Sequence, residues 1–370
     1  MRIAIDARKL HDFGIGTYIR NVLRGLAAVD RTTEYVVLCR PPDVEAVGQL
    51  GANFRPVPES ARPYSIGEQV RIPLSLVRER AHLFHEPHYV LPYATRCRTV
   101  VTIHDCIHLM FPQYLPGSMA HLYARAMMWS AVNRSDRILT VSEASKRDIL
   151  RFFDIPPEKV AVIYNAIDER FLGPPDLKRM DLIRQRYQLD HPFLLYVGNI
   201  KPHKNVERLI DAFGVVRAKG HDDLRLVIIG DDLSRYPALR QAVHRHRLDK
   251  FVRFLGFQPH DTLAGFYRLA RVFVFPSLYE GFGLPPLEAM ACGTPVVTSN
   301  VSSLPEVAGN AALLVDPYDR LSIAEAICRA VSDEPLRLEL SRRGLARARE
   351  FSWAQSVAAI HHIYMDVLER

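Results

Sequence analysis

Short apolar runs rich in β-branched residues alternate along the chain with longer stretches that have helical periodicity. In the first half the runs are RIAIDA, YVVLC, AHLFH, TVVTIH, RILTVS and VAVIY. In the second half they are FLLYVG, LRLVIIG, VRFLG, RVFVFP and PVVTS. Apolar strands separated by amphipathic helices are typical of parallel sheets that are covered on both faces. The pattern therefore predicts an α/β fold with two doubly wound domains in tandem.

The boundary between the domains is expected at 173–175, where GPP interrupts the pattern before a new helix. This divides the chain into domains at 1–172 and 173–351, in keeping with a length of 370 residues, too many for one ordinary core. The last amphipathic segment, 352–370, has no strand after it. One expectation is that it packs back on the first domain, although the sequence alone does not place it.

Composition narrows the class of protein. A hydrophobic share of 48% with 24% charged residues is typical of a soluble globular protein, and no apolar run reaches the roughly 18 residues of a membrane-spanning helix. MRIAID brings in Asp6 too early for a signal peptide, so we expect a cytoplasmic protein. Five scattered cysteines without a CxxC pair disfavour a disulfide framework or a zinc site. A net charge of +7 suits a polyanionic partner, or is a solvated basic surface.

The first candidate site is a glycine pair in DARKLHDFGIGTYIRNVL, where Gly14 and Gly16 are expected in a loop between a strand and a helix. Glycine lets the backbone approach a phosphate, and the N–H groups at a helix start favour an anion. A dinucleotide fingerprint would need glycine in place of Ile19 and an acid in place of Arg40, so a hydride-transfer enzyme is disfavoured. A plain tight turn remains the alternative.

The second domain opens with a similar device, YVGNIKPHKNVERL. Asn199 follows the strand, and Lys201 and Lys204 precede the helix. Lysines at a helix start oppose the helix dipole unless an anion lies there, and pyrophosphate would be such an anion. The alternative is a solvated pair of lysines.

A histidine and an acid follow another strand of the first domain, in TVVTIHDCIHLMF. His104 and Asp105 are expected at the carboxyl edge of the sheet, where ligands bind in open α/β folds. A histidine there can act as acid, base or hydrogen-bond partner, although a lone histidine is more often structural.

The segment YEGFGLPPLEAMACGTP places two carboxylates around a glycine-rich turn. Glu280 is expected on the loop and Glu288 just inside a helix whose first turn suits proline. Carboxylates bind vicinal hydroxyls, as on a ribose or a hexose, and the N–H groups near Gly283 and Leu284 could meet a phosphate or sugar oxygen. The alternative is two helix-capping acids.

The sequence predicts no metal site. The acidic pairs Asp222–Asp223 and Asp231–Asp232 have no acidic or histidine partners nearby in the sequence, and each suits a turn or a helix cap.

Taken together, these motifs resemble the retaining glycosyltransferases of family four over nearly the whole chain. EGFGLPPLEAMACGTPVV is similar to the E-x7-E motif of that family, and VGNIKPHKN to its diphosphate site. TIHDCIHLMFPQYLP and RILTVSEASKRDI resemble its mannosyltransferase-like branch. The resemblance implies the GT-B fold, with two Rossmann-like domains facing a central cleft.

The resemblance also implies roles for the residues of the second domain. Glu280 would hold hydroxyls of the donor sugar, and Glu288 the nucleotide ribose. The backbone at Phe282, Gly283 and Leu284 would contact sugar and phosphate.

Three further positions complete the implied donor site. Lys204 would neutralise the diphosphate, Gly16 and its neighbour Gly14 would lie against the phosphates from the other domain, and His104 would lie by the reacting sugar. The family needs no metal and no cofactor besides its nucleotide-sugar substrate. Asn199 departs from the arginine that is common in the family, and Lys201 is a possible substitute for that charge.

The implied reaction moves a hexose, mannose from GDP-mannose, to a glycan or lipid-linked saccharide acceptor in polysaccharide biosynthesis, with retained configuration. No second carboxylate near His104 offers itself as a nucleophile, which favours front-face attack. UDP-sugar donors remain open, as do a nucleotide-sugar epimerase and a non-catalytic sugar-nucleotide sensor. No nucleic-acid-binding motif is present. Six arginines of the first domain could instead contact a lipid diphosphate or an anionic membrane at the inner face, or form a solvated face: Arg62, Arg71, Arg78, Arg80, Arg96 and Arg98.

Overall fold

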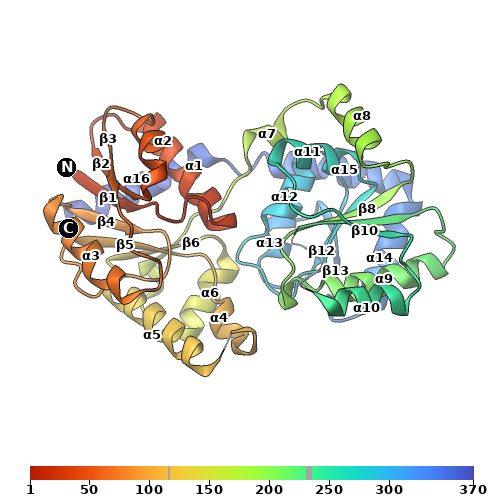
Figure 1. Ribbon diagram of the computed structural model, residues 1–370, viewed down its shortest axis with the longest axis horizontal. Helices are drawn as coiled ribbons and strands as arrows, with labels where there is room; N and C mark the ends of the chain where they lie inside the picture. The colour runs from red at the N-terminus through yellow and green to blue at the C-terminus, as the bar shows by residue number, and fades with distance from the viewer. Residues whose placement is uncertain (116, 231–235) are drawn as a thin grey trace. The chain divides into compact units, whose positions relative to one another are not determined.

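The computed structural model describes residues 1–115, 117–230 and 236–370 (Figure 1). The chain divides into two compact units, the first made of Met1–Asn165 with Ser352–Arg370 and the second of Ala166–Phe351. Each unit is built around one parallel β-sheet with helices on both faces, as the alternating pattern predicts.

The first unit contains a seven-stranded sheet with the order β3-β2-β1-β4-β5-β6-β7. Its strands are β1 (Arg2–Asp6), β2 (Glu34–Cys39), β3 (Phe54–Pro58), β4 (Leu83–Glu86), β5 (Arg98–Ile103), β6 (Arg137–Thr140) and β7 (Val160–Val162). The sequence pattern misses β3, because FRPVP carries two prolines. Proline is tolerated in a sheet at an edge strand, and β3 is an edge strand here.

Helices cover both faces of this sheet. They are α1 (Phe13–Val29), α2 (Val44–Gly48), α3 (Ile66–Arg78), α4 (Ile107–Met110), α5 (Ser118–Arg134), α6 (Glu143–Phe152) and α16 (Trp353–Glu369). One apolar cluster joins the sheet to α1 and α16, and a second joins its other face to α3, α5 and α6. The first unit therefore has a core on each side of its sheet.

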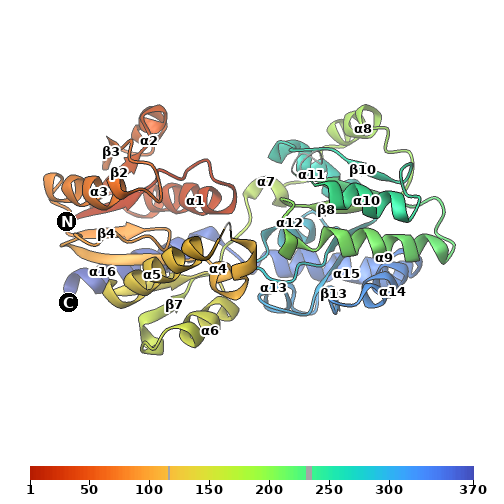
Figure 2. The same ribbon diagram turned by 60° about the horizontal axis from the view of Figure 1, so that its bottom comes forward.

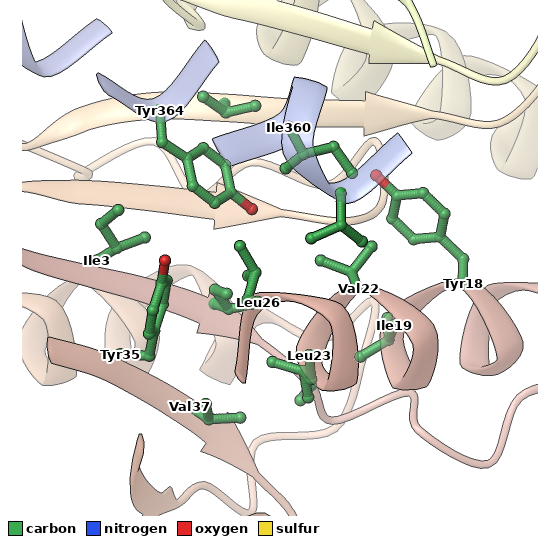
Figure 3. Packing of buried hydrophobic residues seen from close by; sticks show 14 of the residues in the cluster. Ile3, Tyr18, Ile19, Val22, Leu23, Leu26, Tyr35, Val37, Ile360 and Tyr364 are labelled. Carbon is green, nitrogen blue, oxygen red and sulfur yellow. The ribbon is translucent and has the colours of Figure 1, made fainter. Parts of the chain in front are cut away.

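The C-terminal helix α16 packs directly on α1 (Figure 3). A side chain at Gly25 would come within 2.5 Å of Val357, so glycine permits the close approach of the two helices. Ile360 and Tyr364 of α16 are fully buried against the apolar face of α1. This packing places residues 352–370 in the first unit, although they follow the second unit in the sequence.

The second unit contains a six-stranded sheet with the order β10-β9-β8-β11-β12-β13. Its strands are β8 (Phe193–Val197), β9 (Arg225–Ile229), β10 (Val252–Phe254), β11 (Val272–Phe275), β12 (Val296–Ser299) and β13 (Ala312–Val315). Its helices are α7 (Glu169–Leu172), α8 (Leu177–Arg186), α9 (Val206–Ala218), α10 (Pro237–Arg245), α11 (His260–Leu269), α12 (Leu284–Ala291), α13 (Leu304–Ala308), α14 (Arg320–Ser332) and α15 (Glu334–Ala348). Figure 2 shows α9 beside α10 and α14, with which it packs.

The short helix α7 explains why the units divide after Asn165, upstream of the join expected after residue 172. Phe171 of α7 is buried and lies edge-on to Tyr267, and Arg268 donates hydrogen bonds to the carbonyls of Phe171 and Gly173. These contacts tie α7 to the second unit, a long-range effect that the GPP interruption does not reveal.

Among the described residues, no helix combines the length and apolar character that crossing a bilayer requires.

The packing of α16 on α1 leads to a stability prediction. Replacing Ile360, which is fully buried, with alanine should destabilise the first unit by about 2–5 kcal/mol, because the cavity loses apolar contacts. Hydrogen exchange should accelerate in peptides from α1 and α16. The control is Leu338→Ala on α15, where the side chain is exposed. Equal exchange rates in the Ile360 variant and the wild type would show that α16 contributes little to this core.

Candidate functional site

The loop that carries Glu280 is fixed by two serines from a later segment. The Ser302 hydroxyl donates to the Glu280 carbonyl at 2.6 Å and accepts from the Glu280 N–H at 3.2 Å. The Ser303 hydroxyl donates to the carbonyl of Phe282 at 2.7 Å. Because both ends of these bonds are backbone or short side chains, the loop between β11 and α12 has little freedom.

Helix α12 begins directly after this loop, and glycine is required at its start. Gly283 has φ 107°, and a side chain there would come within 2.8 Å of Leu304. Pro285 and Pro286 follow Leu284 and carry no N–H. The amides of Gly283 and Leu284 are therefore the backbone donors that the first turn can offer to a ligand.

Lys204 and Glu280 form an ion pair in this region. The ammonium Nζ lies 2.6 Å from Oε1 and 2.8 Å from Oε2 of the carboxylate, and both side chains are largely buried. The resemblance assigns these residues to different parts of the donor, and the structure brings them into direct contact. A charge-assisted bond of this kind holds both groups in place.

The position of Lys204 is set by the residues beside it. Asn205 adopts a left-handed conformation with φ 61° and donates through Nδ2 to the carbonyls of Pro276 and Pro317, at 2.9 and 2.7 Å. The His203 carbonyl accepts from the Leu278 N–H at 2.7 Å. These bonds link the turn after β8 to the loop after β11, so Lys204 meets Glu280 across 76 residues of sequence.

Glu288 lies on α12 and accepts a hydrogen bond from the Tyr267 hydroxyl at 2.9 Å. Burial raises the pKa of Glu288 to about 7, although the bond from Tyr267 acts in the opposite direction. The Glu288 carboxyl group therefore changes its protonation state near neutral pH.

Asn199 follows β8, after Gly198, whose φ of 153° a residue with a side chain rarely adopts. The buried Oδ1 atom of Asn199 has no hydrogen-bond partner among the described residues. Buried polar atoms are rarely left unpaired, so Asn199 retains capacity to bind a ligand. Lys201 is exposed at the start of the following turn.

In the first unit, His104 is positioned by a backbone carbonyl. Its Nε2 atom lies 3.1 Å from the Pro87 carbonyl, which can only accept, so Nε2 carries the proton and Nδ1 is left as an acceptor. Burial lowers the pKa of His104, against the effect of Asp105. The Asp105 carboxylate accepts from the Ile107 N–H at 3.0 Å and so caps the next turn.

A chain of buried hydrogen bonds supports the ring of Tyr18, which lies edge-on to His104 with centroids 4.9 Å apart. The Tyr18 hydroxyl pairs with Thr102 at 3.1 Å, Thr102 with His85 at 2.8 Å, and His85 with Tyr364 of α16 at 2.6 Å. Burial lowers the pKa of His85 to about 3, so this histidine is neutral. The C-terminal helix thereby contributes to the surroundings of His104.

The structure corrects one expectation for the glycine pair. Gly14 and Gly16 lie in the first turn of α1 and not in a loop, because the helix already begins at Phe13. A side chain at Gly16 would come within 2.4 Å of the Leu10 carbonyl, whereas nothing lies within 4 Å of such a position at Gly14. Close packing of the preceding segment therefore requires glycine at one of the two positions.

Several residues of the site are absent from the sequence predictions: Ser302, Ser303, Asn205, Tyr267 and Tyr18. SSLPEV does carry the signature of a helix start, but the loop that these serines hold lies some twenty positions earlier in the sequence. In the described part of the chain, no group of histidine, cysteine or acidic residues could hold a metal ion. The pair Asp231–Asp232 lies outside the described residues.

Comparison with known proteins gives the family. Residues 14–171 match "Glycosyltransferase Family 4" and residues 180–347 match "Glycosyl transferases group 1". The chain is 34% identical over 307 residues to the O-antigen chain mannosyltransferase B of Escherichia coli, which covers 83% of this chain and 80% of that protein. The chain belongs to glycosyltransferase family 4. The glycosyltransferase is thus a retaining enzyme of a family that typically needs no metal.

Other relatives and structures agree with this placement. The glycosyltransferase is 32% identical to the O-antigen chain mannosyltransferase RfbU of Salmonella typhimurium, over 65% of this chain and 62% of that protein. Its fold matches sucrose-phosphate synthase of Thermosynechococcus elongatus with TM-score 0.82 at 22% identity, covering 100% and 99% of the two chains. It also matches Anabaena Alr3699/HepE in complex with UDP-glucose, with TM-score 0.79 at 17% identity over 99% and 100%. The prediction of a GT-B fold is confirmed.

The raised pKa of Glu288 leads to a prediction for donor binding. An ionised carboxylate accepts from ribose hydroxyls better than a protonated one, and a pKa of about 7 means that ionisation increases as the pH rises through neutrality. The affinity for a nucleotide sugar such as GDP-mannose should increase about tenfold from roughly pH 6 to pH 8. Calorimetric titration at both pH values measures this.

The matched variant for this measurement is Glu288→Gln, which keeps the shape of the side chain but does not titrate. Its affinity should be lower and independent of pH. If the wild-type affinity does not depend on pH, or if the glutamine variant shows the same dependence, the prediction that Glu288 binds the ribose is wrong.

Proposed function

We propose that the enzyme transfers mannose from GDP-mannose, with retained configuration, to a hydroxyl of a glycan or lipid-linked saccharide in polysaccharide biosynthesis. The similarity to O-antigen mannosyltransferases supports the sugar and the pathway class. The observation that carries the proposal is the Lys204–Glu280 ion pair beside the start of α12. It combines a cation for a diphosphate, a carboxylate for sugar hydroxyls and backbone amides for oxygens in one unit.

Each group has a distinct task toward the donor. The diphosphate competes with Glu280 for the Lys204 ammonium, and Glu280 then accepts from hydroxyls of the sugar. The amides of Gly283 and Leu284 donate to phosphate or sugar oxygens. Glu288 accepts from the ribose, with Tyr267 holding its second oxygen in place.

The chemical step breaks the bond between the anomeric carbon and the diphosphate oxygen. The leaving diphosphate gains negative charge, which Lys204 and the helix amides stabilise because they are already oriented. The sugar becomes oxocarbenium-like, as in glycoside hydrolysis. The acceptor hydroxyl attacks from the same face, and its proton passes to the leaving phosphate oxygen, so no charge is left on the sugar.

His104 acts in this scheme as a hydrogen-bond acceptor and not as an acid. Its Nε2 proton is engaged by Pro87 and its pKa is lowered by burial, so the neutral ring offers Nδ1 to a hydroxyl of the donor sugar. Within the second unit, Asn199 adds an unpaired amide oxygen to the groups that meet the donor. In the first unit, Gly14 and Gly16 leave the first turn of α1 without side chains, as binding of phosphate at its N–H groups requires.

The test compares two lysines that lie close in the sequence. Lys204→Ala should lower kcat/KM for mannosyl transfer by about 10²–10³, because it removes the charge that stabilises the leaving diphosphate. Lys201→Ala serves as the control, since that side chain is exposed, and a substantial loss there would show that it compensates for Asn199. Full activity of the Lys204 variant would refute the mechanism.

A panel of nucleotide sugars in thermal-shift and product assays identifies the donor. GDP-mannose should raise the melting temperature and yield a mannosylated product, since a ligand bound to the folded state stabilises it. Glu280→Ala should reduce transfer more than nucleotide binding, and Glu288→Ala should weaken nucleotide binding itself. A larger shift and faster turnover with UDP-glucose, UDP-galactose or UDP-N-acetylglucosamine would replace GDP-mannose as the donor. Isomerised nucleotide sugar would indicate an epimerase, and binding without turnover a sensor.

We further propose that α3 contacts an anionic membrane surface that holds lipid-linked acceptors. Ile66, Val70, Leu74 and Val77 recur at helical spacing along α3, and all four are exposed. Arginines lie on and after the same helix, namely Arg71, Arg78 and Arg80, and all are exposed. Exposed apolar side chains flanked by cations suit an interface with anionic lipid.

Two leucines with matched exposure test this surface. Leu74 on α3 is 63% exposed and Leu338 on α15 is 65% exposed. Leu74→Glu should reduce co-sedimentation with vesicles containing phosphatidylglycerol by about fivefold or more, because a buried CH₂ contributes about 0.8 kcal/mol and the new charge repels the surface. Leu338→Glu should leave it unchanged. Equal losses, or no vesicle binding by the wild type, contradict the proposal.

A further inference from the structure

A buried ionic cluster lies where β1 and β4 end, next to each other in the sheet of the first unit. Arg8 donates to both oxygens of Asp6, to Glu68 at 3.0 Å and to the Ala61 carbonyl at 2.9 Å. The side chain of Arg8 is only 4% exposed. Its guanidinium therefore neutralises the two carboxylates and helps to organise this edge of the sheet.

Three buried polar groups around this cluster are incompletely paired. Glu68 Oε1, Glu86 Oε2 and His88 Nδ1 have no hydrogen-bond partner among the residues that the structure describes. These residues are 2%, 4% and 6% exposed. A buried polar atom without a partner costs free energy, so three in one place point to groups that a ligand pairs.

Lys9 and Tyr64 add a hydrogen-bond donor and an exposed ring beside this cluster. Lys9 Nζ donates to the Tyr64 hydroxyl at 2.8 Å, and that hydroxyl pairs with His88 Nε2 at 3.2 Å. Tyr64 is 48% exposed and has φ 64°, a conformation that costs a non-glycine residue free energy. The tyrosine hydroxyl thus occupies the place between a lysine and a histidine that the hydroxyl of another molecule could take.

The cluster adjoins His104. Glu86 and His88 flank Pro87, whose carbonyl binds His104 Nε2 at 3.1 Å. The charge of Lys9 acts on Glu86, on His88 and on His104 alike. The sequence offers no obvious carboxylate near His104, and the structure places Glu86 next to the residue that binds the His104 ring.

We propose that Lys9, Glu86 and His88 form a subsite that binds hydroxyl groups of the acceptor sugar, with Tyr64 covering it. The inference rests on the proposed glycosyl transfer and specifies the acceptor class. Groups that donate hydrogen bonds lie beside groups that accept them, and the hydroxyls of a saccharide need both. The aromatic rings of Tyr64, His88 and Tyr89, with centroids 4.1 to 6.4 Å apart, add an apolar surface for the sugar.

The charges indicate that this part of the acceptor is neutral. Asp6, Glu68 and Glu86 are three carboxyl groups against the two cations Arg8 and Lys9, and Arg8 is already bound by Asp6 and Glu68. A phosphate would meet a single available cation and at least one repelling carboxylate. Burial raises the pKa of Glu86 well above its usual range, which lets the carboxyl donate to a sugar oxygen.

Binding of a saccharide in the absence of any nucleotide sugar tests this subsite. The neutral probe is p-nitrophenyl α-D-mannoside, and the anionic probe is α-D-mannose 1-phosphate, each titrated by saturation-transfer NMR. The wild type should bind the neutral probe more tightly. Glu86→Ala and Lys9→Met should each weaken it by about tenfold or more, since the first removes the carboxyl group and the second the ammonium group that hydrogen-bond the sugar. Tyr64→Phe keeps the ring and frees Lys9 and His88, so its affinity should equal or exceed that of the wild type.

Controls separate this inference from folding and from the proposed function. Glu158→Ala, at an exposed position of the same unit, should leave mannoside binding unchanged. Glu86→Gln, which preserves shape, should fold even if the alanine variant does not, and should lose part of the affinity. GDP-mannose should bind the wild type and all variants equally. If the wild type does not bind GDP-mannose, the proposed donor is wrong, but the acceptor subsite is not contradicted. Absent mannoside binding, unaffected Glu86 and Lys9 variants, or tighter binding of the phosphate overturns the subsite.

Discussion

Parallel pairing of strands at the centre of each sheet determines where every candidate residue lies. β1 pairs with β4, and β8 with β11, although long segments separate the members of each pair in the sequence. Their carboxyl ends meet at one edge of each sheet. Asp6 and Glu86 end adjacent strands of the first unit, while Asn199 and Glu280 follow adjacent strands of the second. In each sheet the strand order reverses at this pair, because the chain adds strands on one side of β1 or β8 and then on the other. The segments that follow the two strands therefore run in opposite directions, which leaves room for a ligand.

Charge compensation at these edges connects stability with function. A buried ion recovers its lost hydration only through close partners. Lys204 and Glu280 supply such a partnership in the second unit, as Arg8 supplies it for Asp6 and Glu68 in the first. The two ionic clusters differ in which polar groups remain available to a ligand. Lys204 retains an N–H group that a diphosphate can use, whereas Arg8 is bound by Asp6 and Glu68, and the unpaired groups beside it are two carboxyl oxygens and a histidine nitrogen. This difference supports the two proposals made above, an anionic donor bound by the second unit and a neutral saccharide bound by the first.

Hydrogen bonds over long sequence distances make the two sites rigid. Ser302 and Ser303 hold the loop of Glu280, and Asn205 joins the turn of Lys204 to that loop. In the first unit, Tyr364 of the C-terminal helix reaches His85, and through it the ring that supports His104. The return of α16 to the first unit thus shapes the surroundings of the candidate residue His104 as well as the core.

The sequence by itself determined the alternation of strands and helices, the two-domain α/β class and the family, because apolar periodicity and glycine-rich motifs are local. It also indicated Glu280, Glu288, Lys204 and His104, since each follows a recognisable strand or turn. It missed the edge strands β3 and β13, the first because of its prolines, and placed Gly14 and Gly16 in a loop although α1 already includes them. The tertiary structure alone decided that Lys204 contacts Glu280, that Tyr267 binds Glu288 and that Glu86 lies beside the partner of His104. These contacts join residues far apart in the chain, and only the pairing and packing of the sheets bring them together.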